Sequence, residues 1–587
     1  MSNARIALAV FALAMTGPAQ GATSDDFAAL LDESWEWQLT NYPVFASQLG
    51  DKRFNTRWTD MSLAAIEQRQ ADTRAFLQRL YAIDRDALGE ADQLNYELFR
   101  RELQDDIDAG KFKGHVLPFN QRGGVQNLDS NTNYLDFSST QDYDDWLARL
   151  AGIGEYVDQT MALAERGRKD GYMLPEVLMQ RIPDQIAVQL VDDPEASPFY
   201  TIFAEMPDSV PVDEQERLRA TARTTIKDFV LPAYRKLDRY FSNTYLPASR
   251  ESIGLSSLPN GKEWYEFQAR RFTTTQMSPD DIHRLGLNEV KRIRDEMQEI
   301  IDDLDFEGDF QDFLQFLRTD SQFYFDNPDD LYEAYLATSK RIDPELVKLF
   351  GKLPRMPYGV NPIPDSIAPD TTTAYYSRPA ADGSRAGIYW VNLYKPEVRP
   401  KYEIEVLSVH EAMPGHHLQL ALQQELEGMP NFRRYSGFTA FVEGWGLYSE
   451  SLGYDLGLYE DRYSQFGQLT YEMWRAVRLV VDTGIHYKGW TRQQAIDFFK
   501  DNAAKTELDI INEIDRYIVM PGQALAYKIG QLKMKQIRER AEVALGDTFD
   551  VRAFHDELLG GGALPLDLLE QRMDAWVDGQ LATRAVP

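Results

Sequence analysis

The sequence contains no cysteine, so its 587 residues must fold without disulfides and any metal site must lack thiolate ligands. The absence of cysteine also excludes lipid attachment at a lipobox. Basic residues are few beside acidic ones, 62 against 93, which gives a formal charge of -31. This charge argues against nucleic acid or an anionic membrane surface as the main partner and favours solubility, but it does not indicate a function.

Long hydrophobic runs are also lacking, and a membrane-spanning helix needs about 20 apolar residues. The run 6–15 is shorter than that; it follows a weakly positive start and precedes the small residues Ala19 and Gly21. This pattern predicts a signal peptide over 1–21 that is cleaved after Gly21, the alternative being a frayed N-terminal helix. We therefore expect a periplasmic or secreted protein without a stable membrane anchor.

Flexible linkers, low-complexity tracts and internal repeats are absent, so no composition change marks a domain boundary. We expect 22–587 to form a single domain. If it has two lobes, they should be 22–270 and 271–587.

Most of the sequence has helical periodicity. From Ser278, a Ser-Pro-Asp-Asp start supplies an N-cap, a first-turn proline and two carboxylates, and apolar residues then follow at three- and four-residue steps to Leu304. Similar stripes cover 24–40, 62–82, 91–109, 140–167, 213–243, 329–350, 463–488 and 523–545. The sequence therefore predicts a mainly α protein built from many stacked helices.

The segment 356–395 departs from this period. Its prolines exclude a helix, and the β-branched and aromatic runs 371–377 and 387–393 predict two strands with a turn at 381–383. We expect a small antiparallel β-hairpin just upstream of the histidine cluster. Its edge can align an extended peptide by main-chain hydrogen bonds, and the alternative is a hairpin that only caps the helices.

Histidine is scarce, yet three of the seven histidines, His410, His416 and His417, fall within eight residues. The common zinc-peptidase pattern places two histidines four residues apart on a helix, so that both meet one ion. Here the position four after His410 is Pro414, and in an unbroken helix His410 and His417 would lie ~10 Å apart along the axis. Pro414 and Gly415 therefore predict a kink or bulge that returns one histidine to the metal.

We expect His416 to be the second metal ligand after His410, with His417 as the alternative. A third ligand should come from the next helix, where Glu443 and Glu450 share a face. Glu443 has apolar neighbours, among which an unpaired carboxylate would be costly, so we expect it to bind the metal. Glu450 is expected to orient a histidine, the alternative for both glutamates being a solvated position on the helix surface.

Two neutral histidines and one carboxylate leave an open position on zinc, which is typical of a catalytic site with one Zn2+ per chain. Glu411 is then expected to take a proton from the activated water. The other candidates are His486, Tyr517 and Tyr527 for stabilising the reaction intermediate, and Arg478, Arg385 and Tyr389 for binding substrate. A structural salt-bridge network is the alternative for the stripe that contains Arg478 and His486.

Three segments carry a family resemblance: His-Glu-Ala-Met-Pro-Gly-His-His at 410–417, the stretch 443–450, and Arg516-Tyr517 through Tyr527. Together with Tyr375-Tyr376, 382–385 and 285–290, they resemble the bacterial "domain of unknown function 885" family over most of the mature chain. The architecture is similar to the helical zinc metallopeptidases of the thimet oligopeptidase, angiotensin-converting enzyme and carboxypeptidase Taq families. This likeness implies a large multi-helix, zincin-like body with a deep cleft.

These features predict a secreted zinc-dependent peptidase that hydrolyses short peptides. Selection of a C-terminal carboxylate by Arg478 or Arg385 would make it a carboxypeptidase or a dipeptidyl carboxypeptidase. The alternatives are a non-catalytic periplasmic peptide-binding protein, which has no need of Glu411, and a zinc hydrolase of non-peptide amides or esters.

Overall fold

The computed structural model describes residues 19–364, 368, 371–380, 383, 385–435 and 437–585. The predicted signal peptide lies outside these residues except for its last three, which begin the first helix. Over the described ranges, no helix combines the length and the apolar character that a membrane span requires.

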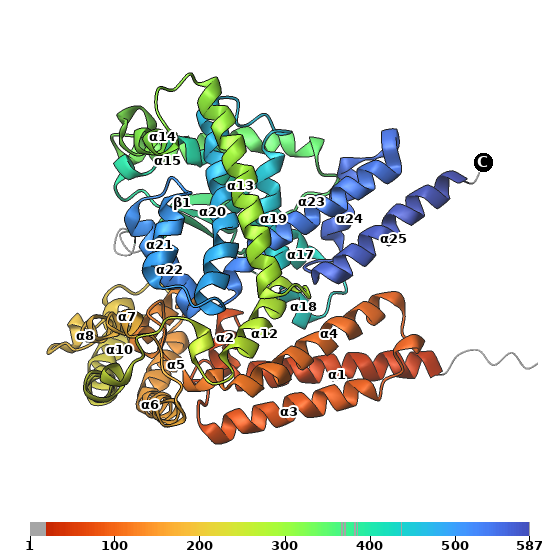
Figure 1. Cartoon of the computed structure of the whole chain (residues 1–587). Helices are drawn as coiled ribbons and strands as arrows, with labels where there is room; N and C mark the ends of the chain where they lie inside the picture. The colour runs from red at the N-terminus through yellow and green to blue at the C-terminus, as the bar shows by residue number, and fades with distance from the viewer. Residues whose placement is uncertain are drawn as a thin grey trace, which may run out of the picture.

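The amino-terminal part of the chain is helical and lies at the bottom of Figure 1. Its first group consists of α1 (Ala19–Asn41), α2 (Pro43–Gln48), α3 (Leu63–Tyr81) and α4 (Glu90–Ala109). The second group consists of α5 (Thr140–Ala151), α6 (Ile153–Asp170), α7 (Glu176–Met179), α8 (Ile182–Ala187), α9 (Thr201–Ala204), α10 (Val212–Thr225) and α11 (Leu231–Tyr240). The helical character predicted for these segments is confirmed.

Two of the predicted helices are interrupted. The stripe 140–167 is two helices that meet at Gly152, which ends α5 and precedes α6. The stripe 213–243 contains a π-helical turn at Ile226–Val230, just before Pro232. Proline cannot donate to the carbonyl four residues earlier, so a local change in hydrogen-bond spacing accommodates it.

The middle of the chain contributes α12 (Gly261–Thr273), α13 (Pro279–Asp303), α14 (Phe310–Thr319) and α15 (Pro328–Ile342). The predicted cap of α13 is present, since Ser278 accepts a hydrogen bond from the amide of Asp281. α13 packs along the long helix α20 (Arg462–His486) through the centre of the molecule (Figure 1). Gly286 permits this close packing, because a Cβ there would lie 2.7 Å from Cβ of Leu479.

The strand region is a three-stranded mixed sheet, so the prediction of a two-stranded hairpin was incomplete. The strands are β1 (Tyr358–Pro362), β2 (Ala374–Ser377) and β3 (Gly387–Val391), in the order β1-β3-β2. The antiparallel pairing of β2 with β3 is confirmed, and β1 adds to β3 in parallel. β1 was not predicted, because Pro362 ends it and proline within a short apolar run argues against a strand.

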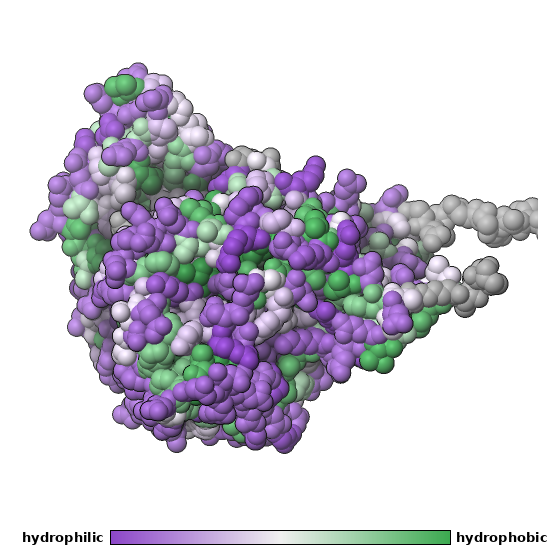
Figure 2. Space-filling model, turned by 90° about the horizontal axis from the view of Figure 1, so that it is seen from above, coloured by the Kyte–Doolittle hydropathy of each residue, from purple (hydrophilic) through white to green (hydrophobic). Residues whose placement is uncertain are grey.

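The remaining helices are α16 (Ile404–Glu411), α17 (His416–Glu425), α18 (Asn431–Tyr435), α19 (Thr439–Leu452), α21 (Arg492–Lys500), α22 (Glu507–Val519), α23 (Ala526–Leu545), α24 (Val551–Gly560) and α25 (Leu566–Ala585). α19 and α23 cross closely at Gly444 and Gly530, where a Cβ on Gly530 would lie 1.9 Å from the carbonyl oxygen of Ala440. One face of the molecule is mainly hydrophilic, with small hydrophobic patches (Figure 2), in keeping with the charge of -31.

Candidate metal centre

The helix carrying the histidine motif is broken between α16 and α17. α16 ends at Glu411, the Met413–Pro414 peptide bond is cis, and α17 begins at His416. Gly415 is required in this turn, because a Cβ there would lie 1.9 Å from the carbonyl oxygen of His410. Trp445 on α19 fixes the turn by donating its indole N–H to the carbonyl of Pro414 at 2.9 Å. The break predicted from Pro414 and Gly415 is therefore present.

The break brings His410, His416 and Glu443 together. One ligand atom from each lies within 4.8 Å of the others. Oε2 of Glu443 is 3.5 Å from Nε2 of His416 and 3.9 Å from Nε2 of His410, and the two imidazole rings are nearly perpendicular at 84°. Two imidazoles and a carboxylate are ligand types that also occur in catalytic zinc sites.

Polar atoms of this cluster are incompletely satisfied by protein. Nδ1 of His416 is buried and has no hydrogen-bond partner among the described residues. Burial works against a charge on His416, but contact with Glu443 raises the pKa of the imidazole above its ordinary value. Burial likewise disfavours a charged Glu443, whose pKa is nevertheless lowered by His416. His416 and Glu443 therefore face a position that suits a cation or a proton. The cluster that they form with His410 fits a bound metal ion.

His410 is held by Glu450, whose Oε1 lies 2.7 Å from Nδ1 of the imidazole. Burial, and then the nearby charges of His416 and Arg475, hold the pKa of His410 well below its usual range. A neutral imidazole with Nδ1 engaged leaves Nε2 free to bind a metal. Gly446 makes room for the ring, since a Cβ there would lie 2.8 Å from Cε1 of His410.

His417 points away from the cluster. Its Nδ1 lies 2.8 Å from the hydroxyl of Tyr376 on β2, and its Nε2 lies 3.0 Å from the carbonyl oxygen of Met356. Both ring nitrogens are thus engaged with the sheet region, which leaves neither free for a metal. Of the two alternatives, the structure places His416, and not His417, beside His410 and Glu443.

Glu411 is the last residue of α16 and is half-buried. Among the described residues, its carboxylate has no hydrogen bond and no ion pair within 4.0 Å. Burial raises its pKa, and Glu443 raises it further while His416 acts in the opposite direction. Glu411 thus combines a raised pKa with a carboxylate that has no partner among the described residues, next to the candidate metal cluster.

The polar stripe on α20 meets α22 in a dense network. Arg478 is buried and donates from Nε to the hydroxyl of Tyr517 at 2.8 Å, and its Nη2 lies 3.1 Å from Oε2 of Glu513. Tyr517 is fully buried and donates to the same carboxylate oxygen at 2.6 Å. These bonds engage Nε and Nη2 of Arg478, whereas its Nη1 is buried and has no hydrogen-bond partner among the described residues.

Tyr527 is the more accessible of the two candidate tyrosines. It is half-buried, its ring stacks 4.4 Å from the Arg478 guanidinium, and its hydroxyl helps to lower the pKa of Glu443. Tyr527 therefore lies beside the metal-binding cluster, where its O–H can donate to a bound oxygen.

None of the other predicted site residues belongs to the cluster of His410, His416 and Glu443. His486 is buried two turns beyond Arg478 and bonds to backbone through both nitrogens, accepting from the amide of Leu255 at 3.0 Å and lying 2.9 Å from the carbonyl oxygen of Tyr517. Tyr389 on β3 is fully buried, 3.4 Å from Oγ of Ser408. Arg385 is exposed and donates to the carbonyl of Ala386.

Sequence reasoning missed Arg378, which directly follows β2. A residue before proline favours the extended conformation, so Arg378 shares a face of the strand with Tyr376, which contacts α17. Its charge acts on His416, and no carboxylate lies within 4.0 Å of it in the described part of the chain. The sequence signal that could have indicated Arg378 was the Arg-Pro pair at the end of a predicted strand.

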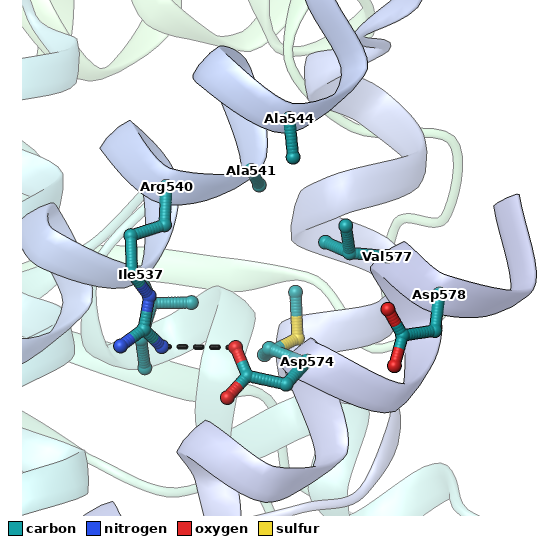
Figure 3. Close-up of a pocket in the computed structure, with 8 residues that line it drawn as sticks. Ile537, Arg540, Ala541, Ala544, Asp574, Val577 and Asp578 are labelled. Carbon is teal, nitrogen blue, oxygen red and sulfur yellow. Dashed lines mark hydrogen bonds and ion pairs between the residues drawn. The ribbon is translucent and has the colours of Figure 1, made fainter. Parts of the chain in front are cut away.

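A hollow of about 180 Å³ lies between α23 and α25 (Figure 3). Arg540, one of the residues that line the hollow, pairs with Asp574 at 2.9 Å. The residues that line the hollow are Ile537, Arg540, Ala541, Ala544, Met573, Asp574, Val577 and Asp578. None of them belongs to the histidine motif or to its neighbours, so this hollow is separate from the candidate metal centre.

The chain belongs to the family described as "Bacterial protein of unknown function (DUF885)", which matches residues 43–573. It is similar to a "putative lipoprotein" of Colwellia psychrerythraea, with 27% identity over 95% of this chain and 100% of that one and a TM-score of 0.89. A "putative lipoprotein of unknown function" of Shewanella oneidensis shares the fold at 18% identity, 94% and 99% coverage and a TM-score of 0.67. No curated protein matches the sequence.

Proposed function

We propose that this DUF885 member is a zinc-dependent peptidase that hydrolyses short peptides, with zinc held by His410, His416 and Glu443. The observation that carries the proposal is the convergence of these three side chains within 4.8 Å, with the unpaired Glu411 at the end of the same helix. A zinc ion bound there would polarise a substrate carbonyl and lower the pKa of a water molecule.

The proposed role of Glu411 is to accept and return a proton. Its carboxylate has no competing partner within 4.0 Å in the described ranges, so an oxygen is available to take a proton from water. Its raised pKa brings proton affinity closer to neutral pH, which suits a group that must also donate to the leaving amine. A structural glutamate would be expected to have an ion-pair or hydrogen-bond partner.

The groups around the cluster suit a peptide substrate. β2 is an edge strand of the sheet and contacts α16, so its free side can align an extended peptide by main-chain hydrogen bonds beside Glu411. In this proposal, the hydroxyl of Tyr527 donates to the carbonyl oxygen as charge develops there. We also propose that a zincin-like cleft lies between this edge of the sheet and α19.

We also propose that the protein is exported. The N-terminal pattern predicts a signal peptide, and the similar proteins from Colwellia and Shewanella are described as putative lipoproteins. This sequence has no cysteine on which a lipid could be placed. We infer a periplasmic or secreted protein that is not lipid-anchored.

The test is the zinc content of the chain together with the effect of Glu411→Gln. We expect about one zinc per chain and peptide hydrolysis that falls by roughly 10²- to 10⁴-fold in Glu411→Gln, which keeps the metal. Glu427→Gln is the matched control, because Glu427 is exposed on the loop after α17.

Three outcomes would contradict the proposal in different ways. Absence of zinc binding would leave a peptide-binding protein as the better hypothesis. Zinc binding with hydrolysis of esters or acyl-amino acids only would indicate a non-peptide hydrolase. Loss of zinc in Glu411→Gln would show that Glu411 is a ligand or a structural residue.

A further inference from the structure

Two buried arginines share one carboxylate where α20 meets α22. Oε2 of Glu513 lies 3.1 Å from Nη2 of Arg478 and 3.0 Å from Nη2 of Arg516. In the described part of the chain, no other carboxylate lies within 4.0 Å of either guanidinium. One positive charge is therefore left without a partner. A buried charge is costly unless an opposite charge balances it, so this place suits an anion.

Arg478 is the arginine of the pair that still has free donors. Every nitrogen of the Arg516 guanidinium has a partner, since Nε and Nη2 bond to Glu513 and Nη1 donates to Oε1 of Gln523 at 2.7 Å. Arg478 donates from Nε to Tyr517 and from Nη2 to Glu513, but its buried Nη1 has no hydrogen-bond partner among the described residues. The two bonds hold the planar group in place, so the N–H groups of Nη1 have a fixed direction.

Contacts along α20 connect Arg478 to the candidate metal centre. Nη2 of Arg475 lies 3.7 Å from Oε1 of Glu450, the same oxygen that lies 2.7 Å from Nδ1 of His410. Arg475 and Arg478 are three residues apart on α20, so their Cβ atoms lie about 5–6 Å apart on one face of the helix. Both guanidinium groups contact the ring of Trp474, whose centroid lies 4.9 Å from each Cζ. Arg478 is therefore one helical turn from an arginine that contacts the residue holding His410.

Tyr527 connects Arg478 to the helix that carries Glu443. The centroid of its ring lies 4.4 Å from Cζ of Arg478. Three residues further along α23, Gly530 packs against Gly444, the neighbour of Glu443, because a Cβ on Gly444 would lie 2.6 Å from Cα of Gly530. Tyr527 is half-buried, so this side of Arg478 borders a residue that reaches solvent.

We propose that Nη1 of Arg478 binds the C-terminal carboxylate of the peptide substrate, which makes the protein act near the carboxyl end of short peptides. This inference rests on the proposed peptidase function. Nη1 offers two N–H groups, and a charged hydrogen bond to a carboxylate is among the strong ones. The carboxylate would also balance the positive charge that Glu513 leaves. Every unmodified peptide carries this group at its end, whatever its sequence.

The test uses three peptides of one sequence: a free C-terminal acid, the C-terminal amide, and an amide whose last residue is replaced by glutamate. We expect the wild-type protein to prefer the acid over the amide by roughly ten- to a hundred-fold in kcat/KM, the range of a charged hydrogen bond. Arg478→Gln should reduce this preference to near one. Arg478→Lys should keep part of it, because lysine keeps the charge but not the planar fork.

The preference is a ratio within each variant, so partial loss of folded protein lowers both rates equally and leaves it unchanged. Arg149→Lys is the matched control. Arg149 lies on α5 among the amino-terminal helices and is also a buried arginine whose Nη1 has no partner among the described residues. This variant should keep the full preference for the acid.

The same peptides are also titrated into Glu411→Gln protein, so that binding is measured without turnover. Equal binding of acid and amide, or binding of neither, would overturn the inference and assign Nη1 to a buried water molecule. Equal loss of both peptides on adding Arg478→Gln would also overturn it.

Two further outcomes separate this inference from its neighbours. Binding of the glutamate-ending amide as tightly as the acid would contradict selection of the C-terminus and assign Arg478 to a side-chain carboxylate. Selective binding of the acid that Arg478→Gln abolishes, without hydrolysis by the zinc-loaded wild-type protein, would refute the peptidase function and leave the role of Arg478 intact.

Discussion

Nδ1 of His410 lies 2.7 Å from Oε1 of Glu450, and this contact turns the opposite nitrogen of the ring toward Glu443. Glu450 is fully buried on α19, the helix that also carries Glu443. One helix therefore supplies both a candidate metal ligand and the group that orients another ligand.

Glu450→Gln should weaken zinc binding by roughly 10- to 100-fold, the usual effect of replacing a group that orients a metal-binding histidine. The amide keeps the volume of the side chain but is a weaker hydrogen-bond acceptor for Nδ1–H. Competition with a chelator measures the affinity. Glu460→Gln, an exposed position after α19, is the control, and equal zinc affinity in the two variants would refute the role of Glu450.

His416→Gln and His417→Gln should have different effects. The first removes a candidate ligand, so zinc content should fall to near zero. The second breaks contacts with Tyr376 and Met356, so it should keep zinc and reduce the free energy of unfolding by about 1–3 kcal/mol. Metal analysis and urea unfolding separate the two variants. Loss of zinc only in His417→Gln would reverse the assignment.

Gly446→Ala should impair the metal centre by steric contact alone. The new Cβ would lie 2.8 Å from Cε1 of His410, so the ring or α19 must shift. Zinc affinity and the melting temperature should both fall. Gly154→Ala on α6 is the matched control, because nothing lies within 4 Å of its Cβ and alanine favours a helix. Unchanged zinc affinity in Gly446→Ala would show that His410 does not depend on this packing.

Two buried histidines outside the metal centre predict loss of stability in acid. Burial lowers the pKa of His486 and of His555 to about 3, whereas an unfolded histidine titrates near 6.5. Between these values the unfolded state binds more protons, so stability falls as pH falls. Each histidine should cost about 2 kcal/mol between pH 7.5 and 5.

Urea unfolding at both pH values tests this effect with His555→Gln. The variant should lose about 2 kcal/mol less than the wild-type protein over the same interval. His555 bonds to Tyr448 and to the carbonyl of Leu349, so the variant's stability at pH 7.5 serves as its own reference. An identical pH dependence in both proteins would show that His555 is protonated in the folded state.

Local sequence was enough to predict most helices and the break in the histidine motif. Apolar spacing and the cap at Ser278 define α13, and Pro414 with Gly415 cannot continue α16. These signals act within a few residues of the chain. The same kind of signal failed at β1, where a short strand ending in proline is indistinguishable from a loop without its partner strand.

The sequence by itself therefore determined that the protein is mainly helical and that a histidine-rich turn interrupts one helix. Only the tertiary structure decided that His416 rather than His417 joins His410 and Glu443, and that Arg478 bonds to Tyr517 and Glu513. The physical reason is that these outcomes depend on which side chains share a small volume after helices distant in sequence have packed. Periodicity and turn chemistry depend on residues that are neighbours along the chain. They carry no information about residues that are distant in sequence but close in space.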